Sequence, residues 1–257
     1  MADQKIIGVI LTYKHAEFLE KLYQSIPAGV FDAILIADDH SGDGIEMIAA
    51  RLGIPCFSHP RLGYGGNIKY GCKKAMEMGA DYMVEIHGDG QYDLGASRPA
   101  IEKVKQGYDL VMGSRFMDLR QPLKDHMSFA RYFANIGLSF IARVVLRAKL
   151  TEFHNGFRVY TRRLLETVNL ETSSNDFLFG FEIIAQARFW NMRIGEVPNR
   201  CYYFNEHTSI SIPKSIQYAF QMMGVLFLYL LAKAGCTIPL FCGKSVGASH
   251  RDEFFHP

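Results

Sequence analysis

Runs of apolar residues alternate with amphipathic stretches along the first half of the chain. Five of these runs have the length and composition of strands, and they lie at residues 6–12, 33–37, 54–57, 82–87 and 109–113. The stretches between them carry apolar residues at helical spacing, as Phe18, Leu19 and Leu22 do. Because strands alternate with helices and the strands are apolar on both faces, the pattern predicts an α/β fold with a doubly wound, mostly parallel sheet.

The second half of the chain is more helical in pattern. Residues 128–150 form a long candidate helix in which large apolar side chains are joined by four cations, Arg131, Arg143, Arg147 and Lys149. Residues 215–232 contain no charged residue, but this run is at the short limit of the ~20 residues that cross a bilayer. We interpret both segments as helices that either lie on a membrane surface or are buried in the core. Shorter patterns predict two strands and a further helix, at residues 155–160, 194–198 and 177–190.

Composition and charge narrow the class of protein. At 257 residues, the chain has the length of one large domain, or of one domain with a C-terminal appendage. The 28 basic and 26 acidic residues give a net charge of +2, which offers no support for a nucleic-acid partner. The cysteines show no C-x-x-C pair and fit a reducing compartment. Since the first residues lack the pattern of a signal peptide, we expect a cytoplasmic protein that can contact the cytoplasmic face of a membrane.

Polar, glycine-rich segments follow several of the predicted strands. In the segment from His87 to Gln91, a carboxylate at Asp89 and an amide oxygen at Gln91 stand among glycines that let the backbone approach a ligand closely. Carboxylate and amide oxygens are ligands that Mg²⁺ accepts together with substrate phosphates. Asp38 and Asp39 follow another strand, and strand carboxyl ends are where open α/β sheets bind ligands. The sequence therefore predicts a pyrophosphate–metal site, although the first segment alone also fits a turn with a solvated Asp.

Three common catalytic and nucleotide-binding motifs do not occur in the sequence. No G-x-G-x-x-G segment is present, and Gly63-Tyr-Gly-Gly-Asn67 does not match that fingerprint. The chain also has no G-x-x-x-x-G-K-[ST] phosphate loop and no G-x-S-x-G elbow. These observations exclude a P-loop NTPase and give no support for a dinucleotide-binding protein or an α/β-hydrolase.

Taken in chain order, the motifs resemble those of the family 2 glycosyltransferases, and within them the dolichyl-phosphate mannose or glucose synthase-like branch. The resemblance runs from about Ile6 to Tyr218. The matching segments are Thr12-Tyr13, Ala37–Gly44, Arg61–Asn67, His87–Gln91, Gly113–Arg115, Asn155–Arg158, and Val197-Pro198 with Arg200 and Ser209. The resemblance implies a GT-A-like domain over residues 1–212. We expect an apolar helical segment at 213–243 and a disordered tail at 244–257.

The resemblance also implies roles for individual residues. The nucleotide would be held by Thr12, Tyr13, Asp38, Asp39, Gly65, Asn67, His87 and Gly88. Asp89 and Gln91 would hold Mg²⁺ or Mn²⁺. Because the leaving diphosphate gains negative charge as the sugar bond breaks, cations must be aimed at it. Arg115, Arg131 and Arg200 are the candidates for the phosphates of the donor or the acceptor.

Two features depart from the family's pattern. His87 stands where the family's metal motif has its first carboxylate. Imidazole is a poorer ligand than a carboxylate for Mg²⁺ but suits Mn²⁺. His87 could therefore bind the metal, lie behind its ligands or face the sugar. In addition, members of this branch often carry extra transmembrane helices, whereas this sequence offers one marginal candidate.

These features together predict an inverting glycosyltransferase. It would move a sugar from a nucleotide-diphosphate sugar to a polyprenyl phosphate or another acceptor at a membrane surface. A lipid phosphate is already anionic, but a sugar hydroxyl needs a general base. Glu182 is the first candidate base and Asp176 the second, and Glu182 could equally tether a loop. Two alternatives stay open: a catalytically silent protein that binds sugar nucleotides or membranes, and a sugar-phosphate nucleotidyltransferase.

Overall fold

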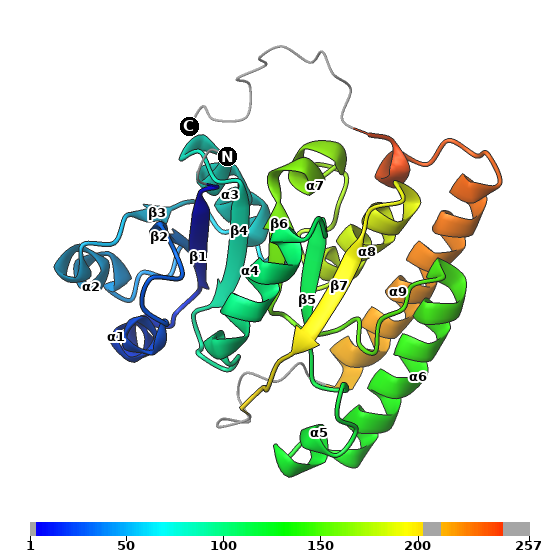
Figure 1. The fold of residues 1–257 in the computed structure, drawn as a ribbon, viewed down its shortest axis with the longest axis horizontal. Coiled ribbons are helices and arrows are strands. Elements are labelled where there is room, and N and C mark those ends of the chain that lie inside the picture. Colours follow the sequence, from blue (N-terminus) through cyan, green and yellow to red (C-terminus); the bar gives the residue numbers. More distant parts are fainter. Residues whose placement is uncertain (1–3, 203–211, 244–257) are drawn as a thin grey trace.

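A seven-stranded sheet runs through the centre of the protein (Figure 1), whose computed structural model describes residues 4–202 and 212–243. The strand order is β3-β2-β1-β4-β6-β5-β7, and only β6 runs antiparallel to its two neighbours. The strands are β1 (Ile6–Thr12), β2 (Ala33–Asp38), β3 (Cys56–Ser58), β4 (Tyr82–His87), β5 (Leu110–Ser114), β6 (Arg158–Thr161) and β7 (Ile194–Pro198). The predicted mostly parallel α/β sheet is confirmed.

Helices cover both faces of the sheet, which explains why its strands are apolar on both sides. One core layer joins the sheet to α1 (Ala16–Ser25), α2 (Ile45–Leu52) and α4 (Ser97–Lys105). The other joins it to α3 (Tyr64–Glu77), α6 (Phe129–Leu146), α7 (Arg162–Thr167), α8 (Phe179–Phe189) and α9 (Ile212–Lys233). A short helix, α5 (Gln121–Lys124), precedes α6. In β1, Ile7 and Val9 enter one layer and Ile6 and Ile10 the other, as the period of two requires.

Several predicted elements differ from the observed ones at their ends. The predicted helix at 128–150 stops at Leu146, because Arg147 adopts a left-handed conformation with φ of 49° that ends the helix. The predicted strand at 155–160 begins only at Arg158, since the Asn155 side chain accepts a hydrogen bond from Phe157 N and holds a turn there. The short helices α5 and α7 had not been predicted. Ser209 and the tail from residue 244 lie outside the described residues.

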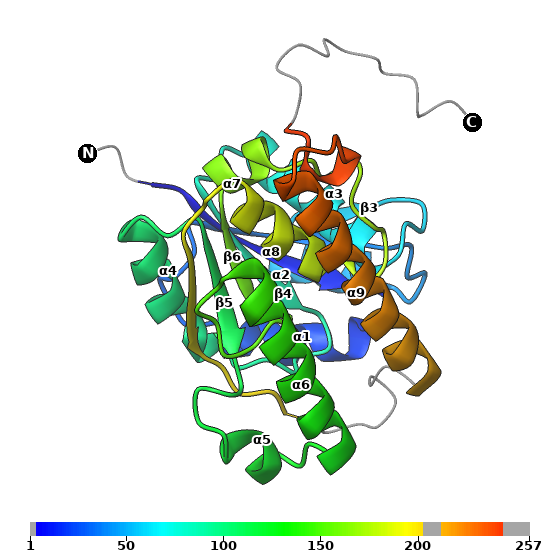
Figure 2. The ribbon, with the colours of Figure 1, turned by 90° about the vertical axis from the view of Figure 1, so that its right-hand side faces the viewer.

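Helices α6 and α9 lie side by side at one edge of the molecule (Figure 2). By length and composition either helix could cross a membrane, and only 17% and 28% of their apolar windows are buried. The sequence had suggested one marginal candidate. Each helix exposes a row of large apolar side chains, namely Phe129, Phe133, Ile136, Phe140 and Val144 on α6, and Ile216, Phe220, Met223, Phe227 and Leu230 on α9. We call these two rows the apolar stripes.

Candidate active site

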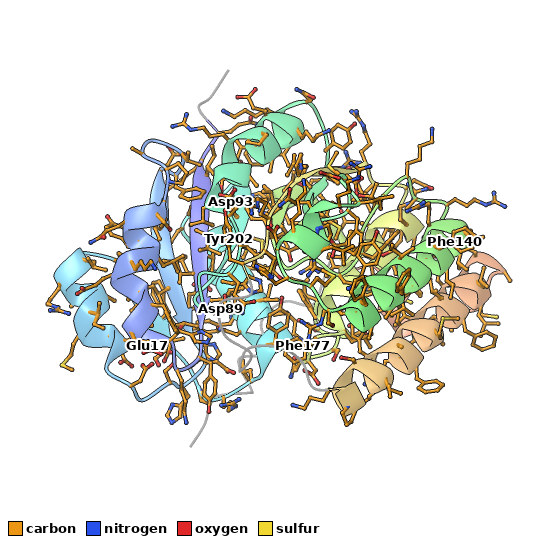
Figure 3. The ribbon with its side chains drawn as sticks, turned by 90° about the horizontal axis from the view of Figure 1, so that it is seen from below. Glu17, Asp89, Asp93, Phe140, Phe177 and Tyr202 are labelled. Atoms are coloured by element: carbon orange, nitrogen blue, oxygen red, sulfur yellow. The ribbon has the colours of Figure 1, made fainter. Side chains whose placement is uncertain are left out.

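The six parallel strands end at the edge of the sheet that faces the viewer in Figure 3, and polar segments follow four of them. β1 ends at Thr12, β2 at Asp38, β4 at His87 and β5 at Ser114. The parallel register pairs Thr12 directly with Asp38. Asp89 lies near the middle of this edge (Figure 3). The fold therefore brings the polar segments that follow separate strands into one region, as expected for an open α/β sheet.

Asp38 shapes the loop after β2. Its buried carboxylate accepts hydrogen bonds from Ser41 N at 3.1 Å, from the Ser41 hydroxyl and from Ser58 Oγ at 2.6 Å. Ser41 Oγ in turn accepts a hydrogen bond from Lys14 N at 2.8 Å, so this loop is joined to the loop after β1. The Thr12 hydroxyl is buried and makes no hydrogen bond to the described residues. Of these two predicted nucleotide contacts, Thr12 thus has an unsatisfied group, whereas Asp38 has several protein partners.

Asp39 holds the loop that precedes α3. Its carboxylate accepts hydrogen bonds from Leu62 N at 2.6 Å and from Gly63 N at 3.0 Å. The same loop places the Arg61 guanidinium 3.4 Å from the centre of the Tyr13 ring, which is cation–π geometry. The loop at 61–63 therefore contacts both Asp39 and Tyr13, and Arg61 is a further candidate that the sequence argument had not assigned a role.

Asn67 joins the ends of β1 and β2. Its side-chain nitrogen donates to Thr12 O at 3.3 Å and to Ala37 O at 3.1 Å. Its oxygen lies 2.9 Å from His59 Nε2. Because Asn67 is buried and these contacts use both ends of its amide, we expect it to support the nucleotide-binding loops from behind.

Asp89 and Gln91 form a compact turn beyond β4. Gly88 N donates to Leu11 O at 2.9 Å, and a Cβ on Gly88 would lie 2.8 Å from that oxygen. Asp89 Oδ1 accepts a hydrogen bond from Gln91 N at 3.1 Å. Its Oδ2 has no hydrogen-bond partner among the described residues and can serve a cation.

Across the described ranges, no group of three or more His, Cys, Asp and Glu side chains is arranged to hold a metal. This sparse set fits Mg²⁺ or Mn²⁺, which take further ligands from substrate phosphates and water. It does not fit an ion held by protein ligands alone.

A buried polar cluster that the sequence argument missed lies behind His87. Glu85, only 1% exposed, accepts hydrogen bonds from Tyr160 OH at 2.5 Å and Tyr64 OH at 3.2 Å. His87 Nε2 lies 3.0 Å from Glu85 Oε1, and Arg158 Nη1 lies 3.6 Å from Oε2. The sequence did contain a sign of this cluster, because Glu85 is a lone carboxylate in an otherwise apolar strand, and a buried carboxylate requires polar partners.

Contacts within the cluster shift the pKa values of Glu85 and His87 in opposite directions. Burial acts to raise the pKa of Glu85, but the His87 hydrogen bond and the Arg158 charge outweigh it and lower this pKa. Burial likewise acts to lower the pKa of His87, but the hydrogen bond and charge of Glu85 and the charge of Asp89 raise it above its usual value. The nearby Arg158 charge thus favours the ionised form of Glu85.

Arg115 and Arg200, two of the candidate arginines, each pair with a carboxylate. Arg115 binds the fully buried Glu152 through its backbone N at 2.7 Å and its Nε at 2.8 Å. Arg200 pairs with Asp125, with Nε 3.3 Å from Oδ2, and its side chain is 49% exposed. Arg131 lies in the first turn of α6. The exposed half of Arg200 is therefore better placed to reach a phosphate than the enclosed Arg115.

The loop at 173–176 packs against the start of α3. A Cβ on Gly65 would lie 2.6 Å from Ser174 O and 2.8 Å from Asp176 O, so this glycine is required by close backbone contact.

Glu182 holds the same loop. Its Oε2 accepts a hydrogen bond from Ser174 N at 2.6 Å, as expected if Glu182 tethers the loop to α8. Burial raises the pKa of Glu182, opposed by this hydrogen bond and by Lys69. Asp176 is exposed and borders a surface pocket with Phe177, Lys214, Gln217, Tyr218 and Gln221.

His154 connects the loop before β6 to α9, since its Nδ1 lies 3.1 Å from Tyr218 OH. Burial, with the charges of Arg115 and Arg158, lowers the pKa of His154 to about 3. Between pH 6.5 and about 3, the unfolded state therefore binds a proton that the folded state excludes. Protonation of His154 therefore does not reduce the free energy of unfolding above pH 6.5. As the pH falls from 6.5 to about 3, the free energy of unfolding decreases, because the unfolded state gains the proton first.

We expect His154→Asn to reduce the acid sensitivity of the protein. Well below pH 6.5, the free energy of unfolding of the wild type should fall more steeply than that of the variant, by up to about 1.4 kcal/mol per pH unit. Asparagine keeps a polar atom near Tyr218 but does not titrate. Urea unfolding at pH 7, 6 and 5 measures the difference, and parallel losses in the two proteins would contradict the assignment.

Comparisons with known proteins agree with this geometry. The family model described as "Glycosyl transferase family 2" matches residues 9–168. The chain is 25% identical over 222 residues to a UDP-N-acetylglucosamine–dolichyl-phosphate N-acetylglucosaminyltransferase of Methanococcus voltae, covering 79% of this chain and 88% of that one. It is 23% identical over 237 residues to glycosyltransferase AglJ of Haloferax volcanii, covering 92% and 74%.

Solved structures with the same fold include glucosyl-3-phosphoglycerate synthase from Mycobacterium tuberculosis. The complex with Mn²⁺, UDP and glucosyl-3-phosphoglycerate has a TM-score of 0.62 at 15% identity, covering 89% of this chain and 80% of that one. The complex with Mn²⁺, UDP-glucose and phosphoglyceric acid has a TM-score of 0.64 at 15% identity, covering 92% and 82%. These similarities confirm the predicted GT-A-like architecture.

Proposed function

The chain belongs to glycosyl transferase family 2, and we propose that it transfers a sugar from a nucleotide-diphosphate sugar to a polyprenyl phosphate at the cytoplasmic face of a membrane. That it is a glycosyltransferase follows from the family, which favours this prediction over the nucleotidyltransferase alternative. The identity of the acceptor and the membrane contact are the parts that we propose. The observation that carries them is the position of the apolar stripes beside the site.

The donor half of the proposal rests on the carboxyl edge of the sheet. The unsatisfied Thr12 hydroxyl, Tyr13 and the loop held by Asp39 would contact the nucleoside. Asp89 Oδ2 and Gln91 would hold Mg²⁺ or Mn²⁺, and Mn²⁺ accompanies UDP in the related structures. When bound, such an ion neutralises the charge that develops on the leaving diphosphate.

The acceptor half rests on α6 and α9. Both helices begin at the end of the molecule where the strands end, and the first turns of α9 border the pocket that contains Asp176 and Phe177 (Figures 1 and 3). From there the apolar stripes continue along the outer surface. A protein lying with the stripes in the headgroup region would present its site to a phosphate at the membrane surface. The dolichyl phosphate named for the Methanococcus voltae relative is such an acceptor.

A phosphate acceptor also agrees with the hydrogen bonding of Glu182, because such an acceptor needs no general base. Its Oε2 is already bound to Ser174 N, which favours a tethering role over that of a general base. An acceptor phosphate oxygen carries its own negative charge and attacks the anomeric carbon without losing a proton. The new carbon–oxygen bond forms opposite the bond to the nucleotide diphosphate as that bond breaks, so the anomeric configuration inverts. The exposed part of Arg200 is a candidate to balance the acceptor charge.

We expect product only when the acceptor is a membrane-borne phosphate. The assay supplies UDP- and GDP-sugars with Mn²⁺ or Mg²⁺, and offers polyprenyl phosphate in vesicles, phosphoglycerate or a soluble sugar. The expected product is a lipid-linked sugar phosphate, with release of the nucleoside diphosphate and loss of activity in chelator.

Faster transfer to phosphoglycerate would contradict the lipid acceptor but keep a phosphate acceptor. Transfer to a soluble sugar hydroxyl would overturn both and return Glu182 to the role of base. No nucleotide release with any donor would support the catalytically silent alternative.

A further inference from the structure

A surface pocket lies between the loop at 173–177 and the first turns of α9. Two residues of the loop and four of the helix line it, namely Asp176, Phe177, Lys214, Gln217, Tyr218 and Gln221. The four helix positions follow the spacing i, i+3, i+4 and i+7, so they form one face of α9. We call this cavity the α9 pocket. Its two walls come from segments that only the tertiary structure brings together.

Phe177 gives the α9 pocket a firmly held apolar wall. Its ring is 38% exposed and stacks on the ring of Tyr64, with a centroid distance of 4.9 Å and an angle of 26°. Tyr64 OH donates a hydrogen bond to the buried Glu85 at 3.2 Å, so the ring beneath Phe177 is itself anchored. An exposed aromatic face that is held in place in this way can pack against an apolar group of a ligand.

The same tyrosine brings the α9 pocket close to the turn at 88–91, which carries the proposed metal ligands. Tyr64 OH lies 3.4 Å from His87 Nε2, and the two ring centroids are 5.7 Å apart. His87 is the last residue of β4 and directly precedes this turn. Asp89 and Phe177 lie on the same side of the molecule in Figure 3. One tyrosine side chain therefore connects the wall of the pocket to the proposed donor site.

Lys214 supplies the α9 pocket with a cation. Its side chain is exposed and makes no hydrogen bond or ion pair with the part of the chain that the structure describes. The carboxylate in the lining, Asp176, accepts a hydrogen bond from Phe177 N at 2.8 Å through Oδ1. Gln217 and Gln221 add amide groups that can donate hydrogen bonds. A lysine ammonium with neighbouring amide donors can bind a phosphate group.

The apolar stripe of α9 begins beside the pocket. Ile216 and Phe220, which are 55% and 75% exposed, each come one position before a glutamine of the pocket lining. Because successive positions on an α-helix are rotated by about 100°, the stripe and the pocket face are neighbours on the surface of α9. A ligand with a phosphate and a long apolar chain can therefore place its phosphate in the pocket while its chain stays on the side of the stripe.

We propose that the α9 pocket binds the acceptor: Lys214 holds the phosphate of a polyprenyl phosphate, and Phe177 packs against its first isoprene unit. This inference rests on the proposed function for the nature of the acceptor. A lipid is favoured over a free phosphate because the apolar stripe adjoins the pocket. The inference gives the loop at 173–177 a role beyond packing against α3, since the loop positions the residue that contacts the acceptor.

Acceptor kinetics with geranyl phosphate test the inference without a membrane, because this short prenyl phosphate is soluble. Lys214→Gln should raise the KM for geranyl phosphate about 10-fold, the usual effect of losing a hydrogen bond to a charged group. Lys214→Arg keeps the charge and the donors and should restore most of the loss. The Kd for UDP with Mn²⁺ should stay at the wild-type value in both variants. Lys73→Gln, which removes an exposed cation from α3, is the matched control and should leave the KM unchanged.

Phe177 is tested in the same assay. Phe177→Ala should also raise the KM for geranyl phosphate about 10-fold, since the prenyl chain loses its apolar contact, and Phe177→Leu should recover most of it. Inhibition by inorganic phosphate should be unchanged in both Phe177 variants and weaker in Lys214→Gln. A weaker affinity for UDP in Phe177→Ala would show that the change disturbs the donor site through Tyr64, and would count against direct contact with the acceptor.

The outcomes separate the inference from the proposed function. If the wild type uses geranyl phosphate and both Lys214→Gln and Phe177→Ala keep its KM, the inference is overturned and the proposed function stands. If the wild type accepts only the long lipid, the same criterion applies to polyprenyl phosphate in vesicles, at vesicle concentrations that bind every variant. If Lys214→Gln raises the KM for phosphoglycerate alone, the pocket binds a soluble phosphate and the lipid assignment is wrong. Transfer to no prenyl phosphate of either kind would overturn both.

Discussion

Replacing Asp89 by asparagine is expected to abolish sugar transfer and to leave the fold intact. The only hydrogen bond that the Asp89 side chain makes to the described residues is accepted from Gln91 N, and an asparagine carbonyl oxygen can accept it equally well. The change therefore removes charge with little loss of structure. A neutral amide cannot hold the ion beside the leaving diphosphate, and we expect a loss of at least ~10³-fold in kcat, similar to other losses of electrostatic stabilisation.

Asp93→Asn is the matched control. Asp93 lies four positions further along the same segment, and its carboxylate accepts a hydrogen bond from Gly95 N at 2.9 Å (Figure 3). Asparagine can keep that bond, so this variant should transfer sugar at close to the wild-type rate. Initial rates at saturating metal and donor, with thermal unfolding of both variants, make the comparison. Near-wild-type turnover by Asp89→Asn would remove Asp89 from the metal site.

The sheet and its site edge could be predicted because their signals are local. Strands buried on both faces appear in sequence as apolar runs, and β1 and β7 match their predicted bounds of 6–12 and 194–198. Convergence of the polar segments then follows from topology alone, since parallel strands end at the same edge of the sheet. The placement of Asp38 and Asp89 at one edge required no further information.

The partners of these residues could not be predicted, because they come from distant segments. Arg115 was expected to face a phosphate, yet the side chain that encloses it, Glu152, lies 37 positions away. Glu85 and Arg158 meet because β6 inserts antiparallel between β4 and β5, a pairing that no spacing in the sequence reveals. Sequence motifs thus located the site, and tertiary contacts decided which side chains within it are free to bind a ligand.

The surroundings of α6 and α9 could not be predicted from the sequence either. An apolar helix has the same composition whether its outer face meets protein or lipid, and both interpretations had been left open. Packing shows that the described residues leave the outer face uncovered: Met222 and Val225 of α9 are buried in the core, while Phe220 and Phe227 are 75% and 61% exposed. Two adjacent helices that leave such rows uncovered form an apolar surface that water does not favour.

Changing Phe133, Phe140, Phe220 and Phe227 together to serine is expected to abolish binding to anionic vesicles. The four side chains are 60–75% exposed, so their removal should cost little folding stability. If each ring is partly immersed at the membrane surface and contributes about 1 kcal/mol, the variant should bind roughly 10³-fold more weakly. Vesicle flotation measures the binding, and extraction at alkaline pH distinguishes a peripheral protein from a spanning one.

Two control variants show which side chains contribute to vesicle binding. Met47→Ser removes another exposed apolar side chain, on α2 and outside the apolar stripes, and should leave vesicle binding unchanged. Changing Arg143, Arg147 and Lys149 to glutamine should weaken binding by ~1 kcal/mol for each cation near the surface, and only at low salt. If the serine variant floats with vesicles as the wild type does, the apolar stripes do not enter the membrane. The acceptor phosphate would then have to reach the site from solution, and the soluble phosphate acceptor would become the better hypothesis.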